Sequence, residues 1–330
     1  GASYFGLETI PNGDGVYTSS APKNTLGSFT LGAGILGVVK DDYKMSAVVA
    51  PGDSVLTFSP SSAVTGSTLR TRGVAAPPTG FDGDAQAFFN RVTAAGGTLS
   101  ATEQTATNQL VLDLKANGLW TPMKAIYPMV GASAAACAQN LKSSSFTGTF
   151  TSGWTFASTG VTPNGTSAYM DTSLVPSTNL TQDSTHLSFY SRTDISGTQQ
   201  EIGTQATNPD RFNLELRYSG NLSSDQYNFL TGRVSVANAN STGFYVASRT
   251  NSSTHKVFKN SSQIGTTNTT TSGTLSLMTN VVFIGLANGG ANYSTKQCAF
   301  ASIGDGLTDT QASNFYTAVN SFQVSLSRNV

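Results

Sequence analysis

Alternation of apolar and polar residues constrains the fold of this chain more than any other feature. Residues 211–218, RFNLELRY, set three apolar side chains and a tyrosine against two arginines, an asparagine and a glutamate. Residues 186–194 alternate in the same way, and residues 243–250 and 280–287 complete a set of strand-like segments. Successive side chains of a strand point to opposite faces, so this pattern is typical of antiparallel strands with one buried face. Such strands joined by polar turns predict a sandwich or jelly roll.

The composition supports a mainly β chain and excludes two classes of partner. Charged residues make up only 11% of the chain, and 33 glycines accompany abundant Ser, Thr and Asn, which suit turns and exposed strand faces. Basic and acidic residues balance at 18 each, so nothing draws the chain to nucleic acid. No apolar run approaches the ~18 residues of a membrane span. We therefore predict no nucleic-acid partner and no membrane insertion.

The first part of the chain predicts a domain of its own. Residues 1–76 contain short strand-like segments separated by Pro, Gly, Asn and Asp. These segments cover residues 3–10, 15–20, 28–34, 45–50, 54–59 and 67–74. Two adjacent prolines open residues 77–80 and exclude both helix interior and ladder pairing, so we expect a linker there.

Residues 81–139 predict a helical segment. Apolar residues between Ala85 and Ala95 recur on one helical face, with two glycines as the stop. Ser100 and Glu103 form a capping box for a second helix that ends near Gly118. A third, short helix is expected over residues 120–130. From residue 140 to 330 the pattern predicts the antiparallel jelly roll, closed by a terminal helix.

The closing stretch, residues 296–316, reads KQCAFASIGDGLTDTQASNFY and raises the question of a reactive site. Its spacing instead predicts a structural clasp: an apolar strand from Cys298 to Ile303, a glycine turn, and a helix that begins at the capping box of Thr308 and Gln311. Residues of one helical face are apolar: Ala312, Phe315, Tyr316, Val319, Phe322 and Leu326. The alternating ligands of a calcium-binding EF-hand loop are missing.

Catalytic, metal-binding and cofactor-binding patterns are weak, so we predict no catalytic residue, no metal site and no cofactor. The glutamates are Glu8, Glu103, Glu201 and Glu215, and no two belong to one predicted strand. His186 and His255 lack a nucleophile elbow nearby and are expected to be solvated on polar strand faces. Cys137 and Cys298 show no disulfide framework, and Cys298 is expected to be a buried, inert thiol.

The polar faces of three predicted strands supply a candidate ligand-binding set. Its members are Tyr190, Arg192, Glu215, Arg217, Tyr245 and Arg249. Aromatic rings and groups capable of paired hydrogen bonds suit a sugar ligand on a concave sheet. The alternative is that these residues form cross-strand ion pairs on a solvated face, each contributing roughly 0.2–1 kcal/mol.

The order of several segments resembles the laminin-G-like, or concanavalin-A-like, jelly-roll family. The segments are GVTPNGTSAYMDTSL (160–174), HLSFYSRT (186–193), HKVFKNSSQIGTT (255–267), VVFIGLANGG (281–290) and CAFASIGDGLTDTQASNFY (298–316). The resemblance covers about residues 140–330 and implies a jelly-roll sandwich. The laminarinase-like glycoside hydrolases of this superfamily carry an E-x-D-x-E strand that this chain lacks, so a non-enzymatic protein is expected.

A second resemblance is to bacteriophage structural proteins in which a short helical segment precedes such a jelly roll. It rests on DAQAFFNRVTAAGG (84–97), LVLDLKANGLWTPMKAIYPMVG (110–131) and KQCAFASIGDGLTD (296–309). It implies a virion component of the tail, fibre or capsid surface, assembled in the host cytoplasm. Other virion proteins, further copies of the chain and a host-surface glycan are the implied partners, with residues 1–76 as the anchor. The alternatives are a secreted glycan-binding or glycan-hydrolysing protein and a jelly-roll capsid lattice protein.

Overall fold

The computed structural model describes residues 80–287 and 291–330 in full, together with the backbones of six short strands between residues 14 and 72. The chain divides into two compact units, Gly1–Gly80 and Phe81–Val330. Within the described residues no helix is long and apolar enough to cross a membrane.

Among the strands that the structure describes in the first unit are three antiparallel pairs, β1 with β6, β2 with β5 and β3 with β4. Their bounds are Asp14–Thr18 (β1), Phe29–Leu31 (β2), Gly34–Lys40 (β3), Tyr43–Val49 (β4), Ser54–Leu56 (β5) and Thr68–Arg72 (β6). The predicted strand segments of this unit overlap these strands, except residues 3–10, which lie outside the described residues. The strand β3 was not predicted.

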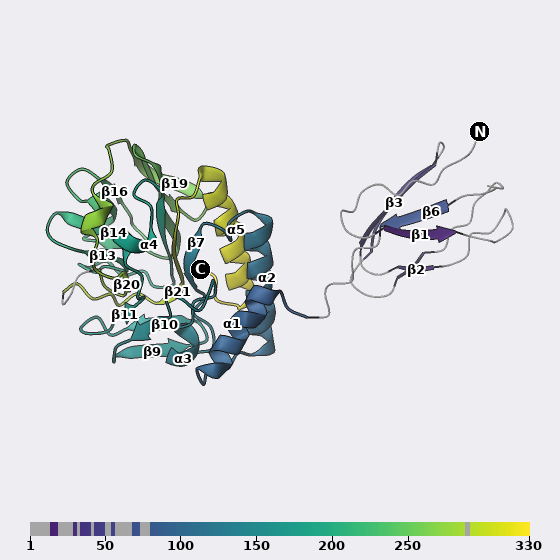
Figure 1. Ribbon diagram of the computed structural model, residues 1–330, viewed down its shortest axis with the longest axis horizontal. Coiled ribbons are helices and arrows are strands. Elements are labelled where there is room, and N and C mark those ends of the chain that lie inside the picture. Colours follow the sequence, from purple (N-terminus) through teal and green to yellow (C-terminus); the bar gives the residue numbers. More distant parts are fainter. Residues whose placement is uncertain are drawn as a thin grey trace. The chain divides into compact units, whose positions relative to one another are not determined.

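The second unit is a sandwich of two antiparallel sheets with helices on one side (Figure 1). The eight-stranded sheet runs in the order β19, β18, β17, β12, β21, β10, β9, and β7 also pairs with β21. Its strands are Met123–Tyr127 (β7), Trp154–Ala157 (β9), Gly160–Pro163 (β10), Thr185–Ser191 (β12), Gly243–Asn251 (β17), Thr254–Lys259 (β18), Ser262–Asn268 (β19) and Cys298–Gly304 (β21). The predicted mainly β, antiparallel sandwich is confirmed.

The seven-stranded sheet runs in the order β16, β15, β14, β13, β20, β11, β8. Its strands are Thr149–Phe150 (β8), Met170–Asp171 (β11), Ile202–Gln205 (β13), Asp210–Tyr218 (β14), Asn221–Asn228 (β15), Arg233–Ala237 (β16) and Phe283–Ile284 (β20). Cross-strand neighbours Leu214, Ile202, Ile284 and Met170 all point into the core between the sheets. This register fixes which residues of the seven-stranded sheet point outward.

Three helices, α1 (Gly83–Ala94), α2 (Ala101–Ala116) and α5 (Asp309–Ser325), pack on the outer face of the eight-stranded sheet. Both predicted capping boxes are present, at Ser100 with Glu103 and at Thr308 with Gln311. The helix-forming patterns in the first and last parts of this unit are therefore confirmed. Two four-residue helices, α3 (Ala134–Cys137) and α4 (Pro176–Asn179), and the short 3₁₀ helix η1 (Leu275–Leu277) lie in connections.

The third helix predicted over residues 120–130 is wrong, because residues 123–127 form strand β7 and pair with β21. Ile126 faces the helix layer, while Ala125 and Tyr127 face the core between the sheets. A strand that is buried on both faces has no apolar–polar alternation. Its apolar run therefore imitates one face of a helix.

The expectation of solvated histidines is also wrong, because both imidazoles are fully buried. His186 Nδ1 lies 2.6 Å from the Asp305 carbonyl oxygen and Nε2 lies 2.9 Å from Ser302 Oγ. Burial lowers the pKa of His186 to about 4 and that of His255 to about 3. Helix α5 covers His186, since the rings of His186 and Phe315 are 6.1 Å apart. The outer face of β12 is thus an interior surface.

The last residues of the chain are fastened to the sandwich by one buried cation. Arg328 is fully buried and donates to the carbonyl oxygens of Met129, Pro128 and Ala299 at 2.6–3.0 Å. Cys137 and Cys298 are both free and buried, and burial raises the pKa of the Cys137 thiol to about 12. The expectation that Cys298 is buried is confirmed.

Candidate functional site

The outer face of the seven-stranded sheet differs from that of its partner sheet, because α1, α2 and α5 all pack on the eight-stranded sheet. Strand register places one residue from each strand in a single line across this outer face. In sheet order the line is Arg233, Asp225, Asn213, Gly203, Phe283, Asp171 and Thr149. We call these seven residues the polar row.

Charged and amide groups at one end of the polar row hold one another in place. Arg233 donates from Nε and Nη2 to the two carboxylate oxygens of Asp225, both at 2.7 Å. Asn213 Oδ1 accepts from the Asp225 backbone N–H at 3.2 Å, and its Nδ2 donates to Glu215 Oε1 at 3.0 Å. Paired bonds between a guanidinium and a carboxylate fix orientation as well as charge. These side chains are therefore set before any ligand arrives.

Glu215 lies beside the polar row on the same face of β14 and is only 2% exposed. Gln200 Nε2 also donates to Glu215 Oε1, at 2.9 Å. Burial raises the pKa of Glu215 to about 7, the charges of Asp225 and Glu201 act in the same direction, and the hydrogen bond from Gln200 opposes them. Gln200 Oε1 is buried without a hydrogen-bond partner among the described residues.

This environment predicts how stability changes with pH. The folded state holds the Glu215 proton more tightly than the unfolded chain, so the free energy of unfolding falls as pH rises from 4.5 through about 7. A carboxyl pKa raised by this amount corresponds to about 3 kcal/mol. Glu215→Gln should remove most of that loss, measured by urea unfolding at pH 5 and pH 8. An unchanged difference between the two pH values in the variant would contradict this assignment.

The polar row also carries one aromatic residue, Phe283, between Gly203 and Asp171. Phe283 and Tyr169 meet edge to face, with ring centres 5.2 Å apart. Gly203 lies between Asn213 and Phe283, and a Cβ atom there would approach Asn213 Cβ to 2.5 Å. Only glycine fits this position, so the row carries no side chain between Asn213 and Phe283. Gly203 is itself buried by its neighbours.

Two of the six residues predicted for ligand binding, Glu215 and Arg217, lie on this face. Arg217 Nη1 donates to Asp194 Oδ1 at 2.8 Å, and side-chain exposures of 23% and 40% leave this pair partly solvated. Asn213 and Glu215 on this face of β14 are nevertheless buried, so the predicted exposed polar face is present only near the ends of the strand, at Arg211 and Arg217. The alternative interpretation, ion pairs on that face, also describes Arg217.

The other four predicted residues do not join them. Tyr190 is buried under the helices, and its hydroxyl accepts from the Val330 N–H at 3.0 Å. Arg192 donates from Nε to the Arg328 carbonyl oxygen at 2.7 Å. These contacts tie strand β12 to the C-terminal residues and present no polar face outward.

Tyr245 and Arg249 are buried between the sheets and are fully shielded from water. The Tyr245 hydroxyl donates to the Asn240 carbonyl oxygen at 2.9 Å, and Arg249 Nη1 donates to that of Ser252 at 2.9 Å. The expectation of one exposed polar face thus fails for β12 and β17, because helices cover one side of their sheet and the second sheet covers the other.

Asp225, Arg233 and Phe283 were absent from the predicted site. Strand β15, NLSSDQYN, has few apolar residues and gives a weak period-two signal, and β20 is only two residues long. The one signal in the sequence for this pair was the spacing of Asp225 and Arg233 on either side of a turn, since opposite charges across a hairpin favour pairing.

Sheet order also brings together carboxylates that are distant in sequence. Glu201, the residue immediately before β13, is fully buried beside β14, and its Oε2 accepts from the Leu216 N–H at 2.6 Å. Its Oε1 lies 2.9 Å from Lys296 Nζ, and Lys296 is equally buried. Glu201 is therefore neutralised by a lysine, while Glu215 has no basic partner within 4 Å among the described residues.

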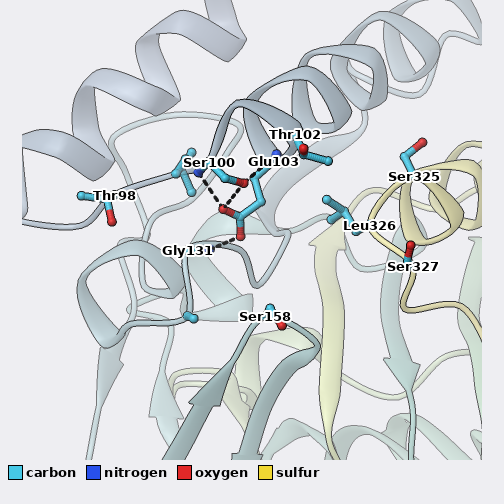
Figure 2. Close-up of a pocket in the computed structure, with 11 residues that line it drawn as sticks. Thr98, Ser100, Thr102, Glu103, Gly131, Ser158, Ser325, Leu326 and Ser327 are labelled. Atoms are coloured by element: carbon cyan, nitrogen blue, oxygen red, sulfur yellow. Dashed lines mark hydrogen bonds between the residues drawn. The ribbon is translucent and has the colours of Figure 1, made fainter.

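A separate hollow of about 620 Å³ lies where the start of α2 meets the end of α5 (Figure 2). Its lining residues are Thr98, Leu99, Ser100, Thr102, Glu103, Gly131, Ala132, Ser158, Ser325, Leu326 and Ser327. The Glu103 carboxylate accepts from Ser100 N at 2.8 Å, Ser100 Oγ at 2.9 Å and Gly131 N at 2.7 Å. Since these bonds cap a helix and hold a turn, the carboxylate has a structural role.

Metal ligation finds no support in the part of the chain that the structure describes, where no group of three or more His, Cys, Asp or Glu residues is arranged to hold an ion.

No protein-family profile and no curated protein sequence matches the chain. Solved structures with partial likeness include domain 4 of AbnA, an extracellular GH43 arabinanase of Geobacillus stearothermophilus in complex with arabinotriose. It is 12% identical, with a TM-score of 0.41, covering 59% of this chain and 98% of that one.

Two further likenesses are to sialidase structures. The CBM40 of the Ruminococcus gnavus IT-sialidase, bound to alpha2,3 sialyllactose, is 16% identical with a TM-score of 0.30, covering 38% of this chain and 78% of that one. A mutant Trypanosoma rangeli sialidase is 11% identical with a TM-score of 0.38, covering 66% of this chain and 39% of that one. At these identities the likeness concerns β architecture alone.

Proposed function

We propose that the second unit binds glycans on the outer face of its seven-stranded sheet. The observation that carries this proposal is the polar row, where the partly exposed Arg233 guanidinium, held by the buried Asp225 carboxylate, shares one face with the aromatic pair of Phe283 and Tyr169. Sugars offer hydroxyl groups to planar polar side chains and C–H faces to aromatic rings. Preset side chains reduce the entropy lost on binding.

A glycan panel with one aromatic substitution tests this proposal. Phe283→Ala removes the aromatic residue of the polar row and should weaken binding to the best glycan about tenfold. Phe81→Ala is the matched control, because Phe81 is 37% exposed and packs on Phe89 of helix α1. Phe283→Leu keeps much of the packing if the alanine variant unfolds. Equal glycan binding by wild type and a folded Phe283 variant would reject the polar row as the site.

We propose further that the protein is a structural component of a bacteriophage particle, in its tail, fibre or capsid surface. The resemblance of residues 84–97, 110–131 and 296–309 to phage structural proteins supports this proposal. The first unit attaches the chain to other virion proteins, the jelly roll faces outward, and several copies assemble in the host cytoplasm. Mass spectrometry of purified particles tests the proposal, and particles that keep the protein after deletion of residues 1–80 would contradict the attachment role.

We also propose that the protein is not an enzyme. Supporting this, the Glu201 carboxylate is bonded to Lys296, whereas glycoside hydrolysis needs two carboxyl groups free to act on the bond. Incubation with a polysaccharide panel should release no new reducing ends. Turnover that disappears in Glu215→Gln would establish the competing glycan-hydrolysing function.

A further inference from the structure

Three arginines project from the outer face of the seven-stranded sheet, and they differ in their partners. Arg233 and Arg217 are each paired with a carboxylate, Asp225 and Asp194 respectively, at 2.7 and 2.8 Å. Arg211 has no carboxylate oxygen within 4 Å and no side-chain hydrogen bond among the described residues. It is the arginine of this face whose charge the described part of the protein leaves unmatched.

Arg211 is nevertheless held in position. Its guanidinium carbon lies 4.8 Å from the ring centre of Phe229, in the turn between β15 and β16, and Arg233 lies 5.4 Å from the same ring. Arg211 Nε is shielded from water and has no acceptor, although the residue as a whole is partly exposed. A cation stacked on an aromatic ring keeps its edge free to bind an anion.

The acidic residue nearest to Arg211 in the sequence, Asp210, does not pair with it. Asp210 Oδ1 accepts from Asn228 Nδ2 at 3.3 Å, and Oδ2 accepts from Thr207 Oγ1 at 3.5 Å. Strand alternation also places Asp210 on the opposite side of β14 from Arg211. The unmatched charge therefore remains available to a ligand.

We propose that Arg211 binds the carboxylate of an acidic sugar, so that the ligand class of this face is the acidic glycans. This inference rests on the proposed glycan-binding function and deepens it. Arg211 and Asn213 are neighbours on one face of β14, and Phe283 lies two strands away. Strand spacings put Arg211 and Phe283 about 12 Å apart, within the span of a short oligosaccharide. A guanidinium binds a carboxylate through two parallel hydrogen bonds, which supplies both charge and orientation.

The test measures the binding of three probes to the full chain. The probes are galacturonate oligomers, their methyl esters, and a sulfated oligosaccharide whose sugar units carry no carboxylate. Wild type should bind the galacturonate oligomer about tenfold more tightly than its ester, because esterification removes the charge and one acceptor. Arg211→Gln should abolish that preference, because it should weaken binding to the acid about tenfold more than binding to the ester. Lys256→Gln, which removes one positive charge paired with Asp309 on the helix side, should keep the preference.

Each outcome separates the two proposals. Equal affinity of wild type for the acid and its ester, or an unchanged preference in Arg211→Gln, would overturn the role of Arg211 and leave glycan binding standing. Stronger binding of the sulfated probe than of the galacturonate would overturn carboxylate recognition in favour of sulfate. Binding of none of the three probes, with a folded protein, would count against the proposed function itself. Arg211→Gln should melt within a few degrees of wild type, since no ion pair is lost.

Discussion

Replacing Lys296 by methionine is expected to lower the free energy of unfolding by about 3–5 kcal/mol, because it leaves the Glu201 carboxylate buried without its cation. Both side chains are fully shielded from water, and the Nζ to Oε1 distance is 2.9 Å. Lys296 Nζ also donates to Gln199 Oε1 at 3.1 Å, so the substitution leaves a second acceptor without its hydrogen bond. Urea unfolding at neutral pH measures the loss.

The double variant Lys296→Met with Glu201→Gln is the control. Removing both charges from a buried pair is often neutral, whereas removing one is costly. The double variant should therefore recover most of the stability that the single variant loses. If the single and double variants were equally unstable, the loss of stability would come from altered packing around Lys296 and not from the broken ion pair.

Truncation of Phe315 to alanine should cost about 3–5 kcal/mol, the range for large aromatic residues in a core. Phe315 is fully buried in helix α5, and its ring centre lies 5.0 Å from that of Phe244 and 5.8 Å from that of Phe300. The cavity would open between the helix layer and the eight-stranded sheet. Thermal and urea unfolding both report the change.

Val324→Ala in the same helix provides the comparison, since Val324 is 51% exposed. It should shift the free energy of unfolding by no more than about 0.5 kcal/mol. A similar loss in the two variants would mean that helix propensity, rather than burial against the sheet, decides the stability of α5.

The last strand and helix were predictable because their signals are local. Thr308 and Gln311 cap α5 through atoms three residues apart, and the apolar face behind them repeats every turn. Ser100 and Glu103 identify the start of α2 for the same reason. Such patterns do not depend on what the helix packs against.

Burial depends on segments that are distant in the chain, so local sequence patterns predict it poorly. The alternation of β12 correctly places Leu187 and Phe189 in the core, yet His186 and Tyr190 on its other face are equally buried. Helix α5 provides that cover from more than a hundred residues away along the chain. The same dependence made β7 look helical.

The polar row could not be predicted because each member comes from a different strand. Its charged end joins Asn213, Asp225 and Arg233 from consecutive hairpins, which sequence spacing can suggest. Its other part joins Asp171 and Phe283, whose pairing follows only from the sheet order. Neither strand order nor register across a sandwich follows from local propensity.

Strand β21 has a consequence for how the protein is made. It pairs with β7 and β12, both of which are synthesised well before it, and α5 follows it directly. A ribosome adding about 5–20 residues per second needs about 5–20 s to go from the end of β12 to β21. During that interval the nascent chain carries strand edges without the partner they have in the finished sheet, and such edges are prone to pair with other chains. The second unit therefore cannot complete its eight-stranded sheet before β21 has been synthesised.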